Sequence, residues 1–295
     1  MKLLDLAATY ITTYASKNPT FDSDGLNAFL GVLRTFEEWP TPIYHVWGLL
    51  FDKLSSLLLL DLAWHHKTPV RRRGGLPSWS WAGWEGVPIF DSSAVRLSES
   101  DDPLCGGIQA RFEDEEGRNL TYSVLQRRTT RQPACGSFRV SPCLRLRGLV
   151  VKVKLQRVDC VFAVFSKTGE QPAKRVYCRV PLANRLVVQI PPFMDTELSL
   201  ETDMEDFEGL VLPSSYTKTW ILILKKRSEF LERIGIVEFQ FPTRGKRLKT
   251  STPMDCGFTG HGEWPKQKKR RGDTAEYGTL ECWAMDEEVR EILLK

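Results

Sequence analysis

The stretch "RRRGGLPSWSWAGWEG", residues 71–86, decides how the chain is organised. Three consecutive arginines are followed by Trp79, Trp81 and Trp84, with small residues between and around the indoles. Small neighbours allow bulky rings to approach other elements closely, and each buried indole removes a large apolar area from water. We therefore predict that this segment is core, at a joint where preceding helices dock on a following β region.

The local pattern of this segment predicts an extended strand. Trp79 and Trp81 alternate with Ser78 and Ser80, which is the period of a β-strand, and glycine then interrupts the pattern. Both indoles would lie on one face. The run Arg71–Arg73 would stack over ring faces or pair with acidic groups.

Upstream of the joint, residues 1–90 are predicted to form a helical cluster. A first helix has the apolar face Leu3, Leu6, Ala7, Tyr10, Ile11 and Tyr14. A second helix begins near residues 22–24, whose side chains could cap it, and ends before Pro40. The leucine-rich stretch from Gly48 to His66 predicts a third helix.

Downstream, the composition changes several times. Residues 91–137 are polar and predict a long mobile insertion, whereas residues 138–241 are β-rich. Residues 242–278 form a basic, loose segment, and residues 279–295 end the chain with a strand or a helix. The apolar stripe of Val289, Ile292 and Leu293 favours the helix. The predicted fold class is α+β: an N-terminal helical cluster packed, through the Trp-rich segment, on a mostly antiparallel β region.

Composition and charge favour an intracellular protein. The chain has 295 residues, a formal net charge of +4 and seven cysteines with no C-x-x-C pair, which argues against a disulfide framework or a structural zinc site. Asp5 interrupts the N-terminal apolar run that a signal peptide needs, and Asp61 interrupts the most apolar stretch. We expect a cytoplasmic location and no membrane partner.

The basic run Lys266–Arg271 keeps nuclear import open as an alternative. Aromatic residues do not alternate with its charges, so the pattern does not favour nucleic acid as a partner.

Candidate chemistry is sparse. His65 and His66 are adjacent, and adjacent side chains on a helix point about 100° apart, so they cannot easily chelate one ion. A nucleophile elbow, a P-loop and a dinucleotide-binding glycine motif are all missing from the sequence. We predict no catalytic, cofactor-binding or metal-binding residue. Two alternatives stay open: a hydrolase or transferase whose site is assembled from distant residues, and a sugar- or nucleotide-binding module that uses exposed tryptophans.

Four segments together resemble a known family. "LPSWSWAGWEG" is similar to the P-S-W-S-W-A-G/S-x-x-G signature of fungal heterokaryon-incompatibility (HET) domain proteins, and "FDSDGLNAFLGVLRTFE" resembles their D-x-L-N-A-F-x-G-I-L segment. "HVWGLLFDKLSSLLLLDLAWHH" resembles their W-G-L-P…L-L-W segment, and "ERIGIVEF" resembles their R-x-G strand. The segments follow the family's order and cover most of residues 1–90 and, more thinly, 205–240.

The resemblance implies an accessory role in non-self recognition. In the family these segments follow the HET core, and the proteins act in programmed cell death after genetically different hyphae fuse. We expect this chain to be a truncated or core-less member that supplies a non-catalytic scaffold or contacts an unknown protein partner. The matching residues, for which we predict structural roles, are Asp24, Leu26, Asn27, Ala28, Phe29, Gly31, Trp47, Gly48, Trp64, Pro77, Ser78, Trp79, Ser80, Trp81, Ala82, Gly83, Trp84, Gly86, Arg233 and Gly235.

Overall fold

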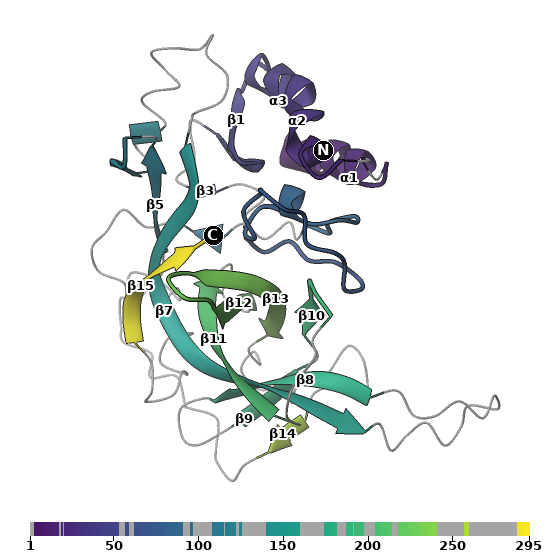
Figure 1. Cartoon of the computed structure of the whole chain (residues 1–295), viewed down its shortest axis with the longest axis vertical. Helices are drawn as coiled ribbons and strands as arrows, with labels where there is room; N and C mark the ends of the chain where they lie inside the picture. The colour runs from purple at the N-terminus through teal and green to yellow at the C-terminus, as the bar shows by residue number, and fades with distance from the viewer. Residues whose placement is uncertain are drawn as a thin grey trace, which may run out of the picture.

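The fold was examined in a computed structural model, which confirms the predicted α+β class (Figure 1). Helices lie at the N-terminal end, and mostly antiparallel strands form a large sheet in the rest of the chain. The structure describes residues 3–17, 19, 21–52, 57–58, 62–90, 95–96, 108–114, 116–121, 124–125, 140–159, 174–181, 187–190, 192–197, 204–213, 218–240, 257–259 and 288–295. The predicted loose segment 242–278 falls outside these residues, apart from 257–259.

The first two predicted helices are present. They are α1 (Leu3–Ala15) and a second region divided into α2 (Asp24–Asn27) and α3 (Leu30–Glu37). Ser23 precedes α2, but its side chain forms no capping hydrogen bond. The expected side-chain cap is therefore not formed within the described residues. Among the described residues, no helix is long and apolar enough to cross a lipid bilayer.

The predicted third helix is wrong. Residues 49–52 and 57–58 of this stretch form β2 (Leu49–Asp52) and β3 (Leu57–Leu58) instead. With the preceding β1 (Ile43–Val46) and the later β4 (Val95–Arg96), they make a four-stranded sheet among the described residues. Trp47 and Gly48 both have positive φ angles, of 52° and 87°, and form the two-residue turn that joins β1 to β2. An almost continuous apolar run does not distinguish a buried strand from a buried helix, so the leucines could not decide between them.

The large sheet has eleven strands within the described residues. They are β5 (Gln109–Asp114), β6 (Asn119–Thr121), β7 (Val140–Asp159), β8 (Lys174–Pro181), β9 (Val187–Ile190), β10 (Phe193–Met194), β11 (Met204–Pro213), β12 (Lys218–Lys226), β13 (Leu231–Gln240), β14 (Gly257–Thr259) and β15 (Glu288–Leu294). Strands β5 and β6 lie inside the stretch predicted as a polar insertion, and β5 pairs with β7. Residues 109–114 and 119–121 therefore belong to the sheet.

The sheet closes on itself around the long strand β7. Val150 pairs with Leu210 of β11 and with Glu288 of β15, so these two strands occupy opposite edges of β7. Pairing continues from β11 through β12 to β13, and Leu231 of β13 pairs with Leu294 of β15. The C-terminal segment thus completes a ring of paired strands.

The favoured C-terminal helix is also wrong. Ile292 and Leu294 are buried, whereas Leu293 between them is only partly buried, which is the alternation of a strand. The helix prediction gave too much weight to Leu293. A short window of sequence shows the apolar residues but not β7, whose backbone pairs with this segment.

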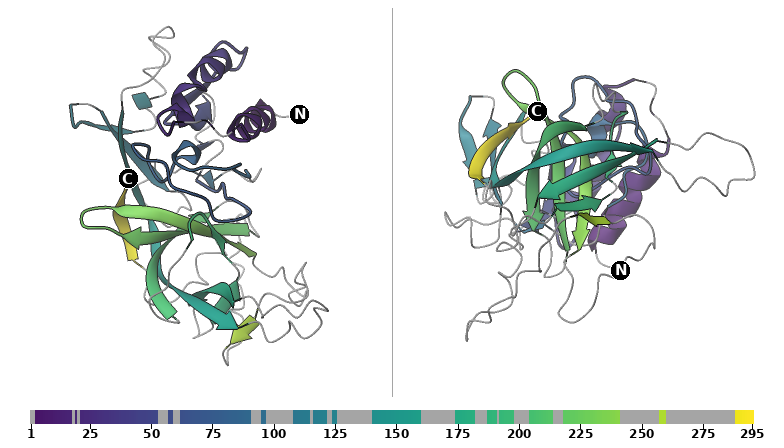
Figure 2. Two further views of the ribbon diagram at one scale, coloured as in Figure 1. Left: turned by 45° about the vertical axis from the view of Figure 1, so that its right-hand side comes forward. Right: turned by 90° about the horizontal axis from the view of Figure 1, so that it is seen from below.

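Two faces of the strands have separate cores. One core includes Phe207, Ile221 and Ile223, and the other includes Leu210, Leu222 and Trp79 of the Trp-rich segment. A third core lies among the helices and contains Phe29, Trp64, Trp81 and Trp84. We call residues 3–52 and 62–90 the N-terminal unit; in Figure 2 its segment 62–90 lies between the helices and the sheet.

Candidate functional site at the tryptophan joint

The Trp-rich segment is compact rather than extended, so its predicted strand is wrong. Residues 78–80 form a turn and Trp81–Gly83 form a 3₁₀ helix, η1. The Ser80 hydroxyl accepts a hydrogen bond from the backbone N–H of Ala82 at 3.1 Å and caps η1. A local serine–backbone bond of this kind competes with strand pairing. As a result, Trp79 and Trp81 enter different cores.

The tryptophans are buried, as predicted. Trp79, Trp81 and Trp84 expose 0%, 2% and 1% of their surface. A buried indole N–H needs an acceptor, and a backbone carbonyl supplies one to each of these three and to Trp64. Trp79 donates to Pro142 at 3.0 Å, Trp81 to Gly48 at 2.9 Å, Trp84 to Ser78 at 2.8 Å and Trp64 to Trp79 at 3.3 Å. These four indoles therefore offer no solvent-facing stacking surface.

The β1–β2 turn is fixed against the same segment. The indole N–H of Trp47 donates to the carbonyl of Val140 at 2.8 Å, and the carbonyl of Trp47 accepts from the Ser80 hydroxyl. A Cβ on Gly48 would lie 2.9 Å from Nε1 of Trp81, in addition to its positive φ. The turn thus connects the start of β7 to η1 through hydrogen bonds that each join a side chain to a main-chain carbonyl.

The three arginines use both of the predicted interactions. Arg71 is exposed and pairs with Asp22 and Glu85. The Arg72 guanidinium lies 5.2 Å from the ring centroid of Trp84. Arg73 is buried and donates to the carbonyl of Trp84 at 2.7 Å. Burial lowers the pKa of Arg72 and Arg73, but arginine remains charged. The two guanidinium groups therefore hold the loop together through hydrogen bonds to carbonyl oxygens.

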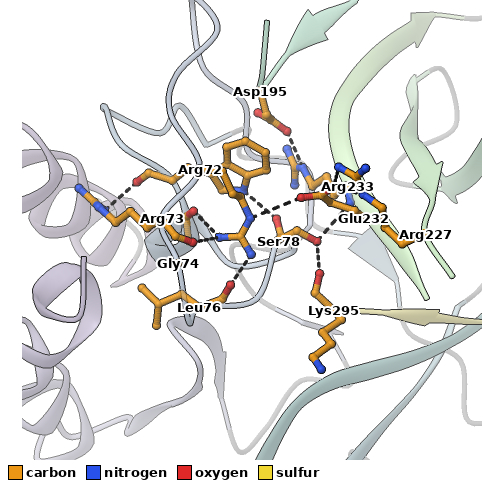
Figure 3. A network of polar contacts seen from close by, with 12 residues as sticks. Arg72, Arg73, Gly74, Leu76, Ser78, Asp195, Arg227, Glu232, Arg233 and Lys295 are labelled. Carbon is orange, nitrogen blue, oxygen red and sulfur yellow. Dashed lines mark hydrogen bonds and ion pairs between the residues drawn. The ribbon is translucent and has the colours of Figure 1, made fainter. Parts of the chain in front are cut away.

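The most connected side chain at the joint is Arg233 of β13, which Figure 3 shows beside Asp195 and Ser78. It is fully buried, and its Nε donates to Oδ2 of Asp195 at 2.8 Å. Its Nη1 donates to the carbonyl of Leu62 at 2.7 Å, and its Nη2 donates to that of Trp64. The guanidinium lies 3.5 Å from the ring centroid of Trp64. One side chain therefore ties the sheet to residues 62–64 of the N-terminal unit.

Asp195 completes this buried network. Its second oxygen lies 3.2 Å from Nδ1 of His66, and its backbone carbonyl accepts from the N–H of Val70 at 3.0 Å. Burial by itself would raise the pKa of Asp195, but Arg233 and His66 hold it below its ordinary value. The carboxylate is therefore ionised and paired inside the protein. We define the tryptophan joint as residues 62–86 together with Trp47, Asp195 and Arg233.

A β-bulge directs Arg233 into the joint. Opposite Ile223 and Leu224 of β12, strand β13 has the extra residue Ile234 between Gly235 and Arg233. An extra residue moves the following side chains to the other face of the sheet. Arg233 therefore lies on the face of Leu224, which contacts the N-terminal unit, and a Cβ on Gly235 would come 2.8 Å from the carbonyl of Phe193. The bulge and the close contact at Gly235 together account for the R-x-G pattern of Arg233, Ile234 and Gly235.

Twelve of the twenty residues that carry the family resemblance belong to this joint. Leu26 and Phe29 are buried beside Trp81, whereas the side chains or positions of Asn27, Ala28 and Gly31 are exposed. Ser78 bonds to two residues far away in the sequence: its hydroxyl donates to the backbone oxygen of Lys295 at 2.5 Å and accepts from the N–H of Arg233 at 3.2 Å. Asp195 and His66 were missed as joint residues, because only the tertiary fold brings them together.

Two glycines of the resemblance should respond oppositely to alanine. A Cβ on Gly83 would lie 2.4 Å from the carbonyl of Pro77 and 2.6 Å from Nη1 of Arg72. We expect Gly83→Ala to lower the free energy of unfolding by about 1–3 kcal/mol through overpacking. Gly31 lies in α3 with no described atom within 4 Å of its Cβ position, so Gly31→Ala should be neutral or raise stability by about 0.5–1 kcal/mol. Urea denaturation measures both, and equal effects would contradict the packing argument.

No protein-family model, curated protein or solved structure matches this chain. Among the described residues, no group of three or more His, Cys, Asp or Glu side chains is arranged to hold a metal ion.

Proposed function

We propose that the chain is a non-catalytic scaffold or recognition region of a HET-type protein of fungal non-self recognition, located in the cytoplasm. The observation that carries this proposal is the convergence of separate sequence segments at one buried joint. Trp47 and Gly48, Trp64, residues 77–84 and Arg233 are far apart in the chain and are joined by direct hydrogen bonds. Segments that resemble one family in sequence thus contribute to one structural unit.

The chemistry of the joint supports a structural role for the family-like residues. The indole N–H groups, the Arg233 guanidinium and the Asp195 carboxylate are each used in hydrogen bonds inside the protein. Such groups hold two layers in a fixed relation. A scaffold of this kind would present the outer surfaces of the helices and of the sheet to a protein partner.

Among the described residues, a hollow in the large sheet bears on the enzyme alternative. This hollow, of about 200 Å³, lies beside the β12–β13 hairpin and β15, and its lining includes Glu208, Arg227 and Arg290. Arg227 pairs with Glu232, and Arg290 pairs with Glu208. These charges are matched to each other, and no observation at the hollow favours a particular reaction.

Expression in a fungal host tests the proposed function. Residues 1–295 alone should leave growth normal, because the scaffold carries no death signal by itself. The same segment fused behind an intact HET core should restrict growth, and the fusion with Trp81→Ala should lose this effect while a fusion with the exposed Phe21→Ala keeps it. Strong toxicity of the isolated segment would overturn the proposal. A fusion that behaves like the core alone would also overturn it.

A further inference from the structure

A buried histidine lies where the N-terminal unit meets the sheet. The ring of His65 lies 4.1 Å from the ring of Phe193 in β10 and 5.9 Å from that of Trp220 in β12 (centroid distances). Its backbone forms a two-way bridge with Ile89, through bonds of 3.0 Å and 2.7 Å. His65 is therefore held between a segment of the N-terminal unit and two strands of the large sheet.

The surroundings of His65 stabilise its neutral imidazole relative to the protonated imidazolium. Nδ1 of His65 is buried and has no hydrogen-bond partner among the described residues. The charged groups that act on the ring are Arg233, Asp195, Glu238 and His66. Burial, followed by the positive charge of Arg233, lowers the pKa of His65, although the two carboxylates act in the opposite direction. The two oxygens of Asp195 contact Arg233 and His66, and Nδ1 of His65 does not bond to this carboxylate.

We propose that His65 makes the joint acid-sensitive, so that its protonation loosens the docking of the N-terminal unit on the large sheet. In the closed joint the imidazole stays neutral, and in the open joint it is free to bind a proton. Proton binding therefore favours opening once the pH falls below the pKa of a free histidine, about 6.5. The effect is absent well above that pH. Between pH 7.5 and pH 5.5 it should raise the opening equilibrium about tenfold.

Amide hydrogen exchange of the whole chain tests this proposal, with rates corrected for the intrinsic effect of pH. The joint is reported by the amides of Val70 and Arg233, which donate across it to the carbonyl of Asp195 and to the hydroxyl of Ser78. Paired amides of β12 at Ile221 and Ile223 report opening of the whole sheet. From pH 7.5 to pH 5.5 the protection of the joint amides should fall about tenfold more than that of the β12 amides.

Two variants identify the responsible group. His65→Phe keeps an aromatic ring between Phe193 and Trp220 but cannot bind a proton, and it should abolish the selective loss of protection. His45→Leu is the matched control. His45 is another buried histidine, with a pKa lowered to about 4 by burial, and it shares the face of β1 that contributes Ile43 to the core among the helices. This variant should keep the selective loss.

Equal changes at the joint and in β12 would overturn the proposal, and so would a tenfold selective loss that persists in His65→Phe. If His65→Phe does not fold, the wild-type comparison between the joint and the β12 amides decides alone.

Discussion

Replacing Arg233 by methionine is expected to lower the free energy of unfolding by about 3–5 kcal/mol, which is the usual cost of removing one partner from a buried ion pair. The change leaves the Asp195 carboxylate fully buried with only His66 beside it. It also removes the donors that Arg233 supplies to the carbonyls of Leu62 and Trp64. Urea denaturation followed by tryptophan fluorescence measures the loss.

Two further variants separate the buried charge from the general effect of losing an arginine. Arg227→Met removes an arginine of the same hairpin whose side chain is 47% exposed and paired with Glu232, and it should cost less than about 1 kcal/mol. The double variant Arg233→Met/Asp195→Leu removes both buried charges and should be more stable than Arg233→Met alone. The explanation fails if Arg233→Met costs no more than Arg227→Met.

Truncation of Trp81 is the second change with a large expected effect. Trp81→Ala should lower the free energy of unfolding by about 3–5 kcal/mol, because the side chain is 2% exposed and fills the core among the helices. The ring contacts Phe29 and Tyr14 edge-on, at centroid distances of 5.8 Å and 6.3 Å. Its N–H also satisfies the carbonyl of Gly48, so the β1–β2 turn would lose a contact with η1.

A large exposed aromatic provides the comparison for Trp81. Phe21 is 67% exposed, and Phe21→Ala should change stability by no more than about 0.5 kcal/mol. Trp81→Phe retains most of the ring but not the N–H, so it should fall between wild type and Trp81→Ala. A loss below about 1 kcal/mol for Trp81→Ala, measured by chemical denaturation, would mean that this indole is not part of the core.

The sequence by itself determined the burial of the tryptophans, the helical start and the β-rich region that contains β7, β12 and β13. These features depend on local information: small residues beside bulky rings, an apolar helical face, and regular alternation as in Val151, Lys152 and Val153. Local signals failed where several backbone conformations bury the same residues equally well. Residues 49–52 and 57–58 of the leucine-rich stretch and residues 288–294 form strands, because each pairs with a neighbouring strand that lies outside the window in which a helix was predicted.

Only the tertiary structure decided how the parts are joined. Asp195 and His66 are 129 positions apart, and no local pattern predicts that they would meet Arg233 in one buried network. That meeting depends on the bulge at Ile234, since one extra residue moves Arg233 to the face that contacts the N-terminal unit. The buried charges then require each other as partners, because none of them has access to water. Sequence composition can indicate which residues enter a core, but long-range pairing determines which polar groups meet there.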